Sequence, residues 1–207
     1  MTDQIQTNKD EPEEQTSDEK KRSGFLNFIL SLFDFLKTVI IIIVLAFIIR
    51  VYLIQPFIVE GESMEPTFQN NDYLITEKVS FRIHAPQRGE VIIFHPPDNP
   101  SLNYIKRLIG LPGDRIQIKD GQVFVNGEKI DESYLATDSN TFAGKESYSV
   151  TLNQDEYFVL GDNRDHSRDS REIGAIPRTN IVSRVWFRLL PIGQIRAFAA
   201  VNYNNSL

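Results

Sequence analysis

Hydrophobic and polar positions divide the chain into three stretches of different character. Residues 1–24 are almost entirely polar or charged, and Ile5 is the only large apolar residue after Met1. Such a stretch cannot bury a core, and we expect it to be disordered. An apolar stretch follows at 25–54, and beyond it short apolar runs alternate with turn residues. The pattern therefore predicts a tail at 1–24, a membrane anchor at 25–54 and a folded domain at 55–207.

The apolar stretch has the composition of a membrane-spanning helix. Its uninterrupted apolar run extends from Val39 to Ile49, with Lys37 and Arg50 at its flanks. These two side chains can extend to the lipid headgroups, so that 36–54 is about long enough to cross a bilayer. A buried helix of a soluble protein and a cleavable export signal are the alternatives. The run lacks helical periodicity, which disfavours a buried helix of a soluble protein. No small-x-small pair follows it, which disfavours a cleavable export signal.

Basic residues predict the orientation of this anchor. Lys20, Lys21 and Arg22 directly precede the apolar stretch. Because such residues remain on the cytoplasmic side, we expect a single-pass protein of the cell membrane with a cytoplasmic tail and everything after about residue 51 outside. The sequence leaves open whether 25–35 lies along the membrane interface or within the crossing.

The folded part has the alternation of an antiparallel β protein. Apolar residues alternate with polar ones around Ile116–Ile118 and Val123–Val125, and the turn pairs Asp-Gly and Asn-Gly follow these runs. We expect further strands at 57–59, 73–77, 90–95, 103–109, 156–160 and 182–187. Without an internal repeat or an alternation of helix and strand, the predicted fold class is mainly β, a coiled antiparallel sheet domain behind one N-terminal transmembrane helix.

Composition narrows the function. The chain has 22 Lys+Arg against 28 Asp+Glu and a formal net charge of -6, so it lacks the basic surface that binds nucleic acid. It contains no cysteine, which excludes thiolate metal sites and thiol nucleophiles but does not reveal the redox compartment. His84, His95 and His166 lack the spacing of a helical zinc pair. We therefore expect no metal and no other cofactor.

Ser63 is the first candidate for chemistry. It follows a short β-run, with Gly61 two residues before it and Pro66 three residues after it. Glycine permits backbone angles that other residues avoid, and proline restricts the residue before it, so the backbone here is tightly shaped. A turn serine is nevertheless the simpler interpretation of this segment alone. The segment is not a G-x-S-x-G elbow, because Glu65 stands where the second glycine would be. A serine also needs a base that takes its proton.

Lys106 is the most unusual candidate for that base, because it lies within the apolar, strand-like stretch 103–109. An outward-facing lysine of an alternating strand is the alternative. A general base must be neutral, so the pKa has to fall from about 10.4 to about 8 or below, which requires roughly 3 to 4 kcal/mol. Burial can supply this free energy if no carboxylate pairs with the amine.

A third segment, 161–174, is dense in charge. Its Asp and Arg residues are interleaved, and it directly follows the apolar residues 157–160. A solvated loop is the ordinary interpretation of such a run. The interleaved signs favour a loop that is held by ion pairs and can brace the wall of an active site.

These three segments, in this order behind an anchor, resemble the type I signal peptidases (leader peptidases) of bacteria, and their compact Gram-positive-like branch in particular. The motifs are Ser63-Met64-Glu65-Pro66-Thr67, then Tyr104-Ile105-Lys106-Arg107 with Gly110-Leu111-Pro112-Gly113-Asp114, and Gly161-Asp162-Asn163-Arg164-Asp165 with Ser167, Asp169, Ser170 and Arg171. The resemblance covers about residues 36–190. It implies a membrane-bound serine endopeptidase that cleaves signal peptides from exported preproteins after small residues at -3 and -1, by a Ser-Lys dyad.

The resemblance also implies roles for single residues. Ser63 would attack the scissile carbonyl, and neutral Lys106 would be the general base. Ser167 would hold the lysine amine by a hydrogen bond, Asp169 and Arg171 would brace the loop, and Asp162, Asn163 and Arg164 would support it. Substrate pockets would lie between the strand before the serine and the strand of the lysine. The residues placed to line them, each with core packing as the alternative, are Phe57, Val59, Met64, Tyr104 and Ile105.

The sequence departs from part of this family at one position. Some members carry a serine two residues before the nucleophile, whose hydroxyl helps to bind the oxyanion, and this chain has Gly61 there. Loss of one such donor costs about 10² to 10³ in rate, so a compensating donor is expected. The implied partners are signal peptides of secreted preproteins and the lipid bilayer, with the protein translocation machinery as a further candidate and no nucleic acid.

Three other functions remain as alternatives. A Ser-His-Asp hydrolase would use His95 or His166 as its base. A catalytically inactive, membrane-tethered export factor would bind extended peptides without turnover. A self-cleaving repressor protease shares the dyad but requires a DNA-binding domain, and here the apolar stretch occupies that place.

Overall fold

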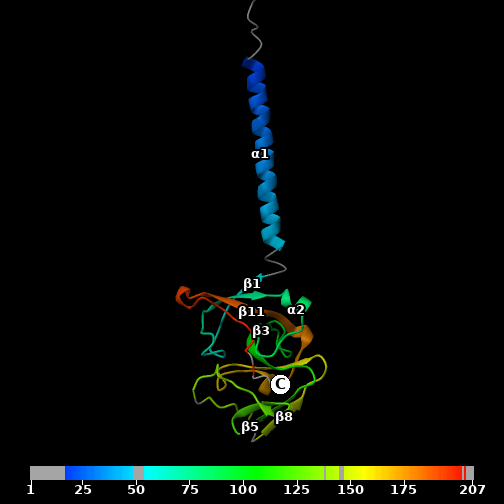
Figure 1. Ribbon diagram of the computed structural model, residues 1–207, viewed down its shortest axis with the longest axis vertical. Helices are drawn as coiled ribbons and strands as arrows, with labels where there is room; N and C mark the ends of the chain where they lie inside the picture. Colours follow the sequence, from blue (N-terminus) through cyan, green and yellow to red (C-terminus); the bar gives the residue numbers. More distant parts are fainter. Residues whose placement is uncertain (1–16, 49–53, 138, 145–146, 202, 204–207) are drawn as a thin grey trace, which may run out of the picture. The chain divides into compact units, whose positions relative to one another are not determined.

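The computed structural model describes residues 17–48, 54–137, 139–144, 147–201 and 203. The chain divides into two compact units, Met1–Ile48 and Ile49–Leu207. The described part of the first unit is a single helix, α1 (Ser17–Ile48), whereas the second unit is built mainly from β-strands (Figure 1).

Helix α1 is long and apolar enough to cross a membrane. Its candidate span is Asn27–Phe47, a stretch of 21 residues. Most large apolar side chains of this span are exposed, as Ile41 and Phe47 illustrate, which fits a helix surrounded by lipid. The span begins earlier than the expected 36–54, because the helix continues without a break through 25–35. Residues 49–53 of the expected crossing lie outside the described residues.

The prediction of a disordered tail is wrong for its last part. Residues 17–24 are the first turns of α1, and 1–16 lie outside the described residues. Glu19, Lys20, Lys21 and Arg22 are good helix formers, and a helix that is already nucleated by a long apolar segment extends through such residues at little cost.

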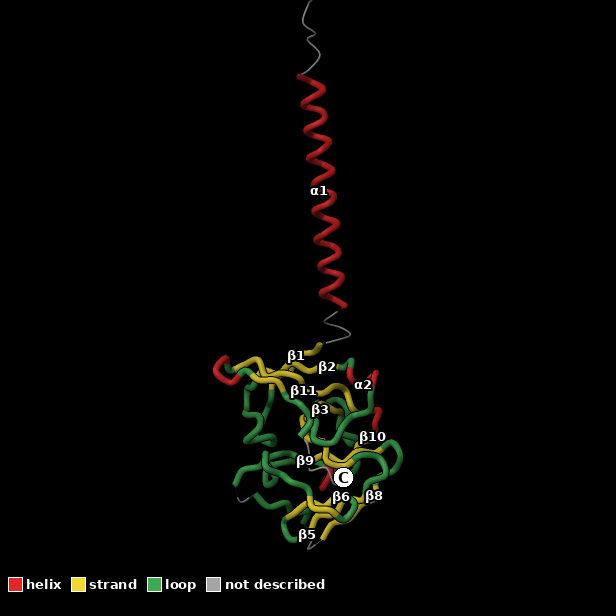
Figure 2. The backbone as a smooth tube through the Cα atoms, in the orientation of Figure 1, coloured by secondary structure: helices red, strands yellow, loops and turns green. Residues whose placement is uncertain are grey.

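Two antiparallel sheets form the second unit (Figure 2), which confirms the predicted fold class. The larger sheet has the order β1-β2-β11-β3-β4-β9-β10, with β12 paired to β11, and the smaller one has the order β7-β6-β5-β8. The strands of the larger sheet are β1 (Ile54–Ile58), β2 (Tyr73–Glu77), β3 (Val91–Phe94), β4 (Tyr104–Gly110), β9 (Glu156–Leu160), β10 (Ile176–Pro177), β11 (Ile181–Leu190) and β12 (Arg196–Ala197). The smaller sheet has β5 (Arg115–Lys119), β6 (Gln122–Val125), β7 (Glu128–Lys129) and β8 (Ser147–Thr151). Two short helices, α2 (Ser80–Ile83) and α3 (Ser170–Ile173), lie in the connections.

Alternation and turn chemistry located most of these strands. Strands β2 and β9 coincide with the predicted ranges, and Asp120 and Asn126 adopt the positive φ that the predicted tight turns require. The sequence did not predict β8, because its apolar positions, Tyr148 and Val150, stand among serines and threonines that equally suit a loop.

Strand β4 links the cores of the two sheets. Leu108 packs into a cluster with residues of β3 and β9, whereas Ile109 faces the cluster that contains Ile116 and Ile118 of β5. At the end of β4, the packing around Gly110 leaves no room for a side chain, since a Cβ there would lie 2.7 Å from both Ile116 Cδ1 and Leu152 Cδ1. The strand that carries Lys106 is thus fixed on both faces.

Candidate active site

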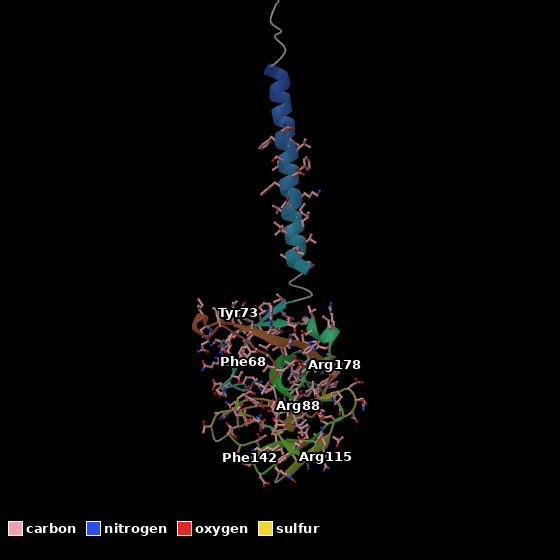
Figure 3. The ribbon with its side chains drawn as sticks, in the orientation of Figure 1. Phe68, Tyr73, Arg88, Arg115, Phe142 and Arg178 are labelled. Atoms are coloured by element: carbon pink, nitrogen blue, oxygen red, sulfur yellow. The ribbon has the colours of Figure 1, made fainter. Side chains whose placement is uncertain are left out.

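Ser63 lies in the connection between β1 and β2, which is tied down on both sides. The amide of Val59 donates to the carbonyl of Asp72, and the amide of Asn71 donates to the carbonyl of Val59. The next residue, Met64, is fully buried. Phe68, labelled in Figure 3, packs in the same apolar cluster. The backbone of the serine is therefore held by the core beneath it, while Ser63 itself is only partly buried.

Lys106 lies opposite this serine on β4, where it pairs with Ile92 of β3. Lys106 is buried, with only 4% of its surface exposed. The amine Nζ donates hydrogen bonds to Ser63 Oγ at 2.7 Å and to the carbonyl of Ile105 at 2.9 Å. The structure therefore brings the two candidate residues into direct contact, at the distance that proton transfer between them requires.

Burial changes the acidity of this amine. Desolvation lowers the pKa of Lys106 from 10.5 to about 8, against the opposing charges of Asp169 and Asp162. The positive charge of Arg171 lowers the pKa further. An amine in this environment is neutral in a substantial fraction of molecules at mildly alkaline pH, which a general base needs.

The two nearby carboxylates are each paired with an arginine of their own. Asp162 accepts two hydrogen bonds from Arg107, at 2.8 and 2.6 Å, and Asp169 accepts two from the Arg171 side chain, at 2.8 and 2.9 Å. Both carboxylates are fully buried. Because their charges are balanced locally, neither of these two carboxylates forms an ion pair with the lysine amine, as a neutral amine requires.

Arg107 is the main residue of this site to which the sequence assigned no role. It is 3% exposed, and besides Asp162 it donates to the carbonyl of Gly89 at 3.0 Å and to Thr67 Oγ1 at 3.3 Å. The sequence did hold a sign of such a residue, because the acidic residues within 161–174 require cationic partners if the segment is buried. Nothing in the local pattern, however, identified which of the arginines supplies it.

The loop after β9 supports the serine as well. The amide of Asn163 donates to the carbonyl of Ser63 at 3.1 Å. Arg164 is buried and donates to the carbonyl of Gly161 at 3.0 Å and to both carboxylate oxygens of Glu132. The amide of Gly161 donates to Asp169 Oδ2 at 2.9 Å, so that the loop closes on itself.

The hydrogen bond expected between Ser167 and Lys106 is not formed in this structure. Ser167 Oγ is buried and has no hydrogen-bond partner among the described residues, while Nζ of Lys106 is bonded to Ser63 and to the Ile105 carbonyl. The Ser167 side chain instead packs against Gly161, where a Cβ would lie 2.1 Å from Oγ. The same Cβ would lie 2.5 Å from the carbonyl oxygen of Ser63, so Gly161 lets the loop pack directly against the serine backbone.

A groove of about 450 Å³ opens beside the two residues. Phe57, Val59, Tyr104 and Ile105 line it together with Ser63 and Lys106. Met64 does not line it, because its side chain lies in the core, where it is fully buried in one cluster with Phe68. The lining residues that the sequence did not suggest are Ile58, Glu60, Leu74, Ile93, Leu102, Asn103 and Arg168.

The groove lies between two strands with unpaired edges. Strand β1 is at the end of its sheet, and the pairing of β4 with β9 begins only at Arg107, which leaves 104–106 without a neighbour on that side among the described residues. An extended peptide can add to such edges through its backbone. Gly61 stands near one wall, and a Cβ there would meet nothing within 4 Å, so this position offers open space and no side-chain donor to an oxyanion.

The histidines take other roles. Nδ1 of His95 lies 2.9 Å from the carbonyl of Leu102, and His166 is exposed on the loop after β9. In the described part of the chain, the hydrogen-bond partner of the Ser63 hydroxyl is the lysine. The geometry favours an amine over an imidazole as the base.

Comparison with known proteins gives a consistent result. The family model "Signal peptidase, peptidase S26" matches residues 32–190, which is more than half of the chain. A probable signal peptidase I-2 of Synechocystis is 40% identical over 164 residues, covering 77% of this chain and 73% of the relative. Signal peptidase I of Bacillus licheniformis is 38% identical over 176 residues, with 80% and 92% covered. The crystal structure of a signal peptidase I from Enterococcus faecalis is 30% identical, covers 49% of this chain and 97% of that one, and has a TM-score of 0.42.

Proposed function

The chain belongs to the signal peptidase family, peptidase S26, and from this premise we propose that Ser63 and Lys106 are the dyad with which it cleaves signal peptides. The family is one of serine proteases that act as signal peptidase I, so the alternative of an inactive export factor is disfavoured. The observation that carries the proposal is the 2.7 Å contact between a serine hydroxyl and a buried lysine whose pKa is lowered to about 8.

The proposed mechanism uses the lysine amine twice. Neutral Nζ of Lys106 takes the proton of Ser63 Oγ as the oxygen attacks the scissile carbonyl, and the resulting ammonium gives a proton to the leaving amine of the mature protein. In the second half, Nζ takes a proton from the water that attacks the acyl-enzyme, and Ser63 Oγ recovers its proton on release. The Ile105 carbonyl, 2.9 Å from Nζ, orients the amine through both steps.

Substrate recognition follows from the groove. A signal peptide that adds as an extended strand between β1 and 104–106 would present alternate side chains to the wall formed by Phe57, Val59 and Ile105. A shallow apolar wall admits small side chains and excludes large ones, which supports selection of small residues at -3 and -1. The backbone N–H of Ser63 would be one oxyanion donor, as expected for a chain with Gly61.

The proposal includes the place of action. Helix α1 anchors the protein in the lipid bilayer, 1–24 remains in the cytoplasm, and 55–207 is the extracytoplasmic peptidase domain. The span Asn27–Phe47 and the basic residues Lys20, Lys21 and Arg22 before it support this arrangement. Preproteins emerging from the translocation machinery are the proposed substrates.

The dyad is tested by single substitutions in the full-length, detergent-solubilised protein. Ser63→Ala and Lys106→Ala should each abolish cleavage of a preprotein in a gel-based assay while the protein still unfolds cooperatively. Ser133→Ala and Lys129→Ala, at exposed positions outside the groove, are matched controls that should retain full activity. Cleavage near the wild-type rate by either dyad variant refutes the assignment. A variant in which glutamine replaces all three histidines should retain cleavage, and that result excludes a Ser-His-Asp mechanism.

A further inference from the structure

Arg168 lies at the groove but takes no part in the proposed chemistry. It stands in the loop between β9 and α3 and lines the groove together with Tyr104 and Leu102. The charged residues of the groove lining are Glu60, Lys106 and Arg168, and of these Lys106 is buried against Ser63. Arg168 is therefore the solvent-accessible cation that the described lining presents to a bound peptide, with 43% of its side chain exposed.

Three partners from three segments fix the Arg168 guanidinium. Nη2 donates to Asp98 Oδ2 at 2.5 Å, Nε donates to Glu172 Oε1 at 2.7 Å, and Nη1 donates to the hydroxyl of Tyr104 at 3.3 Å. A guanidinium has five N–H donors. With three used by these partners, two remain to donate to a ligand, and the three contacts fix the orientation of the guanidinium.

These contacts contribute little to folding. The side chains of Asp98 and Glu172 are 46% and 62% exposed, and exposed ion pairs stabilise a protein by about 0 to 1 kcal/mol. Neither carboxylate lines the groove. The guanidinium thus stands between the groove and two carboxylates, and it masks their negative charge from a bound peptide.

The position along β4 indicates which part of a peptide this cation faces. Tyr104 precedes Lys106 by two residues, about 7 Å along a strand. A peptide whose scissile bond lies at Ser63 and Lys106 extends along this edge with the residues that precede the cut. Arg168, at the hydroxyl end of Tyr104, lies beyond the residue next to the cut and faces side chains further upstream.

We propose that Arg168 is a specificity-determining residue that selects signal peptides by the charge of the residues preceding the cleavage site. It favours acidic and neutral side chains and disfavours basic ones at the position facing Tyr104. The inference rests on the proposed function, since it takes the orientation of the peptide from the dyad. It adds a charge criterion to the size criterion of the apolar wall.

The test is a ratio of two substrates measured on the same enzyme. Paired signal-peptide substrates differ only in Glu or Lys, placed in turn at the second, fourth and fifth residues before the cut. Two unit charges about 7 Å apart in a water-like environment change a binding equilibrium about threefold. The charge of Arg168 should therefore raise kcat/KM for the Glu substrate and lower it for the Lys substrate. At the position that faces Arg168, Arg168→Gln should therefore lower the Glu/Lys ratio of kcat/KM about five- to tenfold, while Arg168→Lys retains most of it.

Two further variants make the result decisive. Asp98→Asn removes one of the masked carboxylates and should shift the ratio in the opposite direction. Arg115→Gln is the matched control, because Arg115 is an exposed arginine of β5 that lies near the opposite end of the domain from Tyr73 (Figure 3). Its ratio should equal that of the wild type.

The inference is overturned if the Glu/Lys ratio of Arg168→Gln stays within twofold of the wild-type ratio at all three positions. It is equally overturned if Asp98→Asn shifts the ratio in the same direction as Arg168→Gln. Failure of the dyad is a separate outcome, seen as retained cleavage by Ser63→Ala or Lys106→Ala. Salt at 0.5 M should reduce the difference between wild type and Arg168→Gln, because the charges are exposed.

Discussion

At the scale of single residues, the reactivity of this protein depends on the environment of one amine. Lys106 is buried, and the two carboxylates whose charges act on it are each neutralised by an arginine. Either carboxylate alone, without its arginine, would raise the pKa of the lysine toward its ordinary value. Arg107 and Arg171 therefore act on the base by occupying the carboxylates that would otherwise hold its proton, and the charge of Arg171 also lowers the pKa of the amine directly.

The first prediction concerns the pH dependence of cleavage. Only the neutral amine accepts the serine proton, so kcat/KM should rise with pH along a limb with its midpoint near 8, the pKa to which burial lowers Lys106. The profile is measured on a peptide substrate between pH 6 and 10. A limb with its midpoint near 10.5 would mean that the lysine is not desolvated in the active enzyme.

The same burial has a cost in stability. Because the folded-state pKa is below the unfolded one, the unfolded chain binds more protons between about pH 8 and 10.5, and stability rises with pH across this window. Lys106→Met should raise the free energy of unfolding by about 1 to 3 kcal/mol relative to the wild type at pH 7. Most of this difference should disappear above pH 10.5, where the lysine is neutral in both the folded and the unfolded wild type. Denaturant unfolding at the two pH values measures the effect. Equal stabilities of variant and wild type at pH 7 would contradict the buried, destabilised amine.

At the scale of elements, the dyad depends on the register of β4. This strand pairs with β3 along 104–107 and with β9 only from Arg107 onward, so one strand serves both as a core strand and as an open edge. The open edge is short, and the rest of β4 is held between the two sheets. A peptide can add there without any loss of core packing.

The second half of β4 can be disturbed without touching the chemistry. Gly110→Ala would place a methyl group 2.7 Å from Ile116 Cδ1 and Leu152 Cδ1 and 2.9 Å from Phe158 Cβ. We expect a loss of about 1 to 3 kcal/mol in the free energy of unfolding, with kcat of the folded enzyme changed less than twofold. Gly193→Ala is the control, since a Cβ there meets nothing within 4 Å and should change stability by less than about 0.5 kcal/mol. Equal stabilities of the two variants would contradict the close packing between the sheets.

At the scale of the whole molecule, an apolar helix precedes a peptidase domain of the signal peptidase family. The absence of cysteine from the sequence makes the orientation of the protein directly measurable. It also means that no disulfide links the strands, so the domain is held by its apolar clusters, hydrogen bonds and ion pairs.

Single cysteines report the side of the membrane on which each part lies. Thr7→Cys marks the tail and Ser133→Cys marks an exposed loop of the peptidase domain. In intact cells, or in spheroplasts of a bacterium with an outer membrane, an impermeant maleimide should label Cys at position 133 and leave position 7 unlabelled until the cells are lysed. Labelling of position 7 before lysis would reverse the proposed orientation.

The sequence by itself determined the features that depend on neighbouring residues. The apolar helix, the alternation of most strands, the turns at Asp120 and Asn126 and the three motifs are all local patterns, and they sufficed for the fold class and the family. It placed the end of the tail wrongly, because helix propagation from an apolar segment extends beyond the composition that predicts disorder.

Only the tertiary structure decided which of the distant groups meet and what each meeting does to their charge. Ser63 and Lys106 are 43 residues apart and Arg107 and Asp162 are 55 apart, so their contacts depend on how sheets pair and pack. Packing likewise places the Met64 side chain in the core and leaves Ser167 Oγ without the expected partner among the described residues. Desolvation is a property of everything that surrounds a group, and that surrounding is assembled from the whole chain.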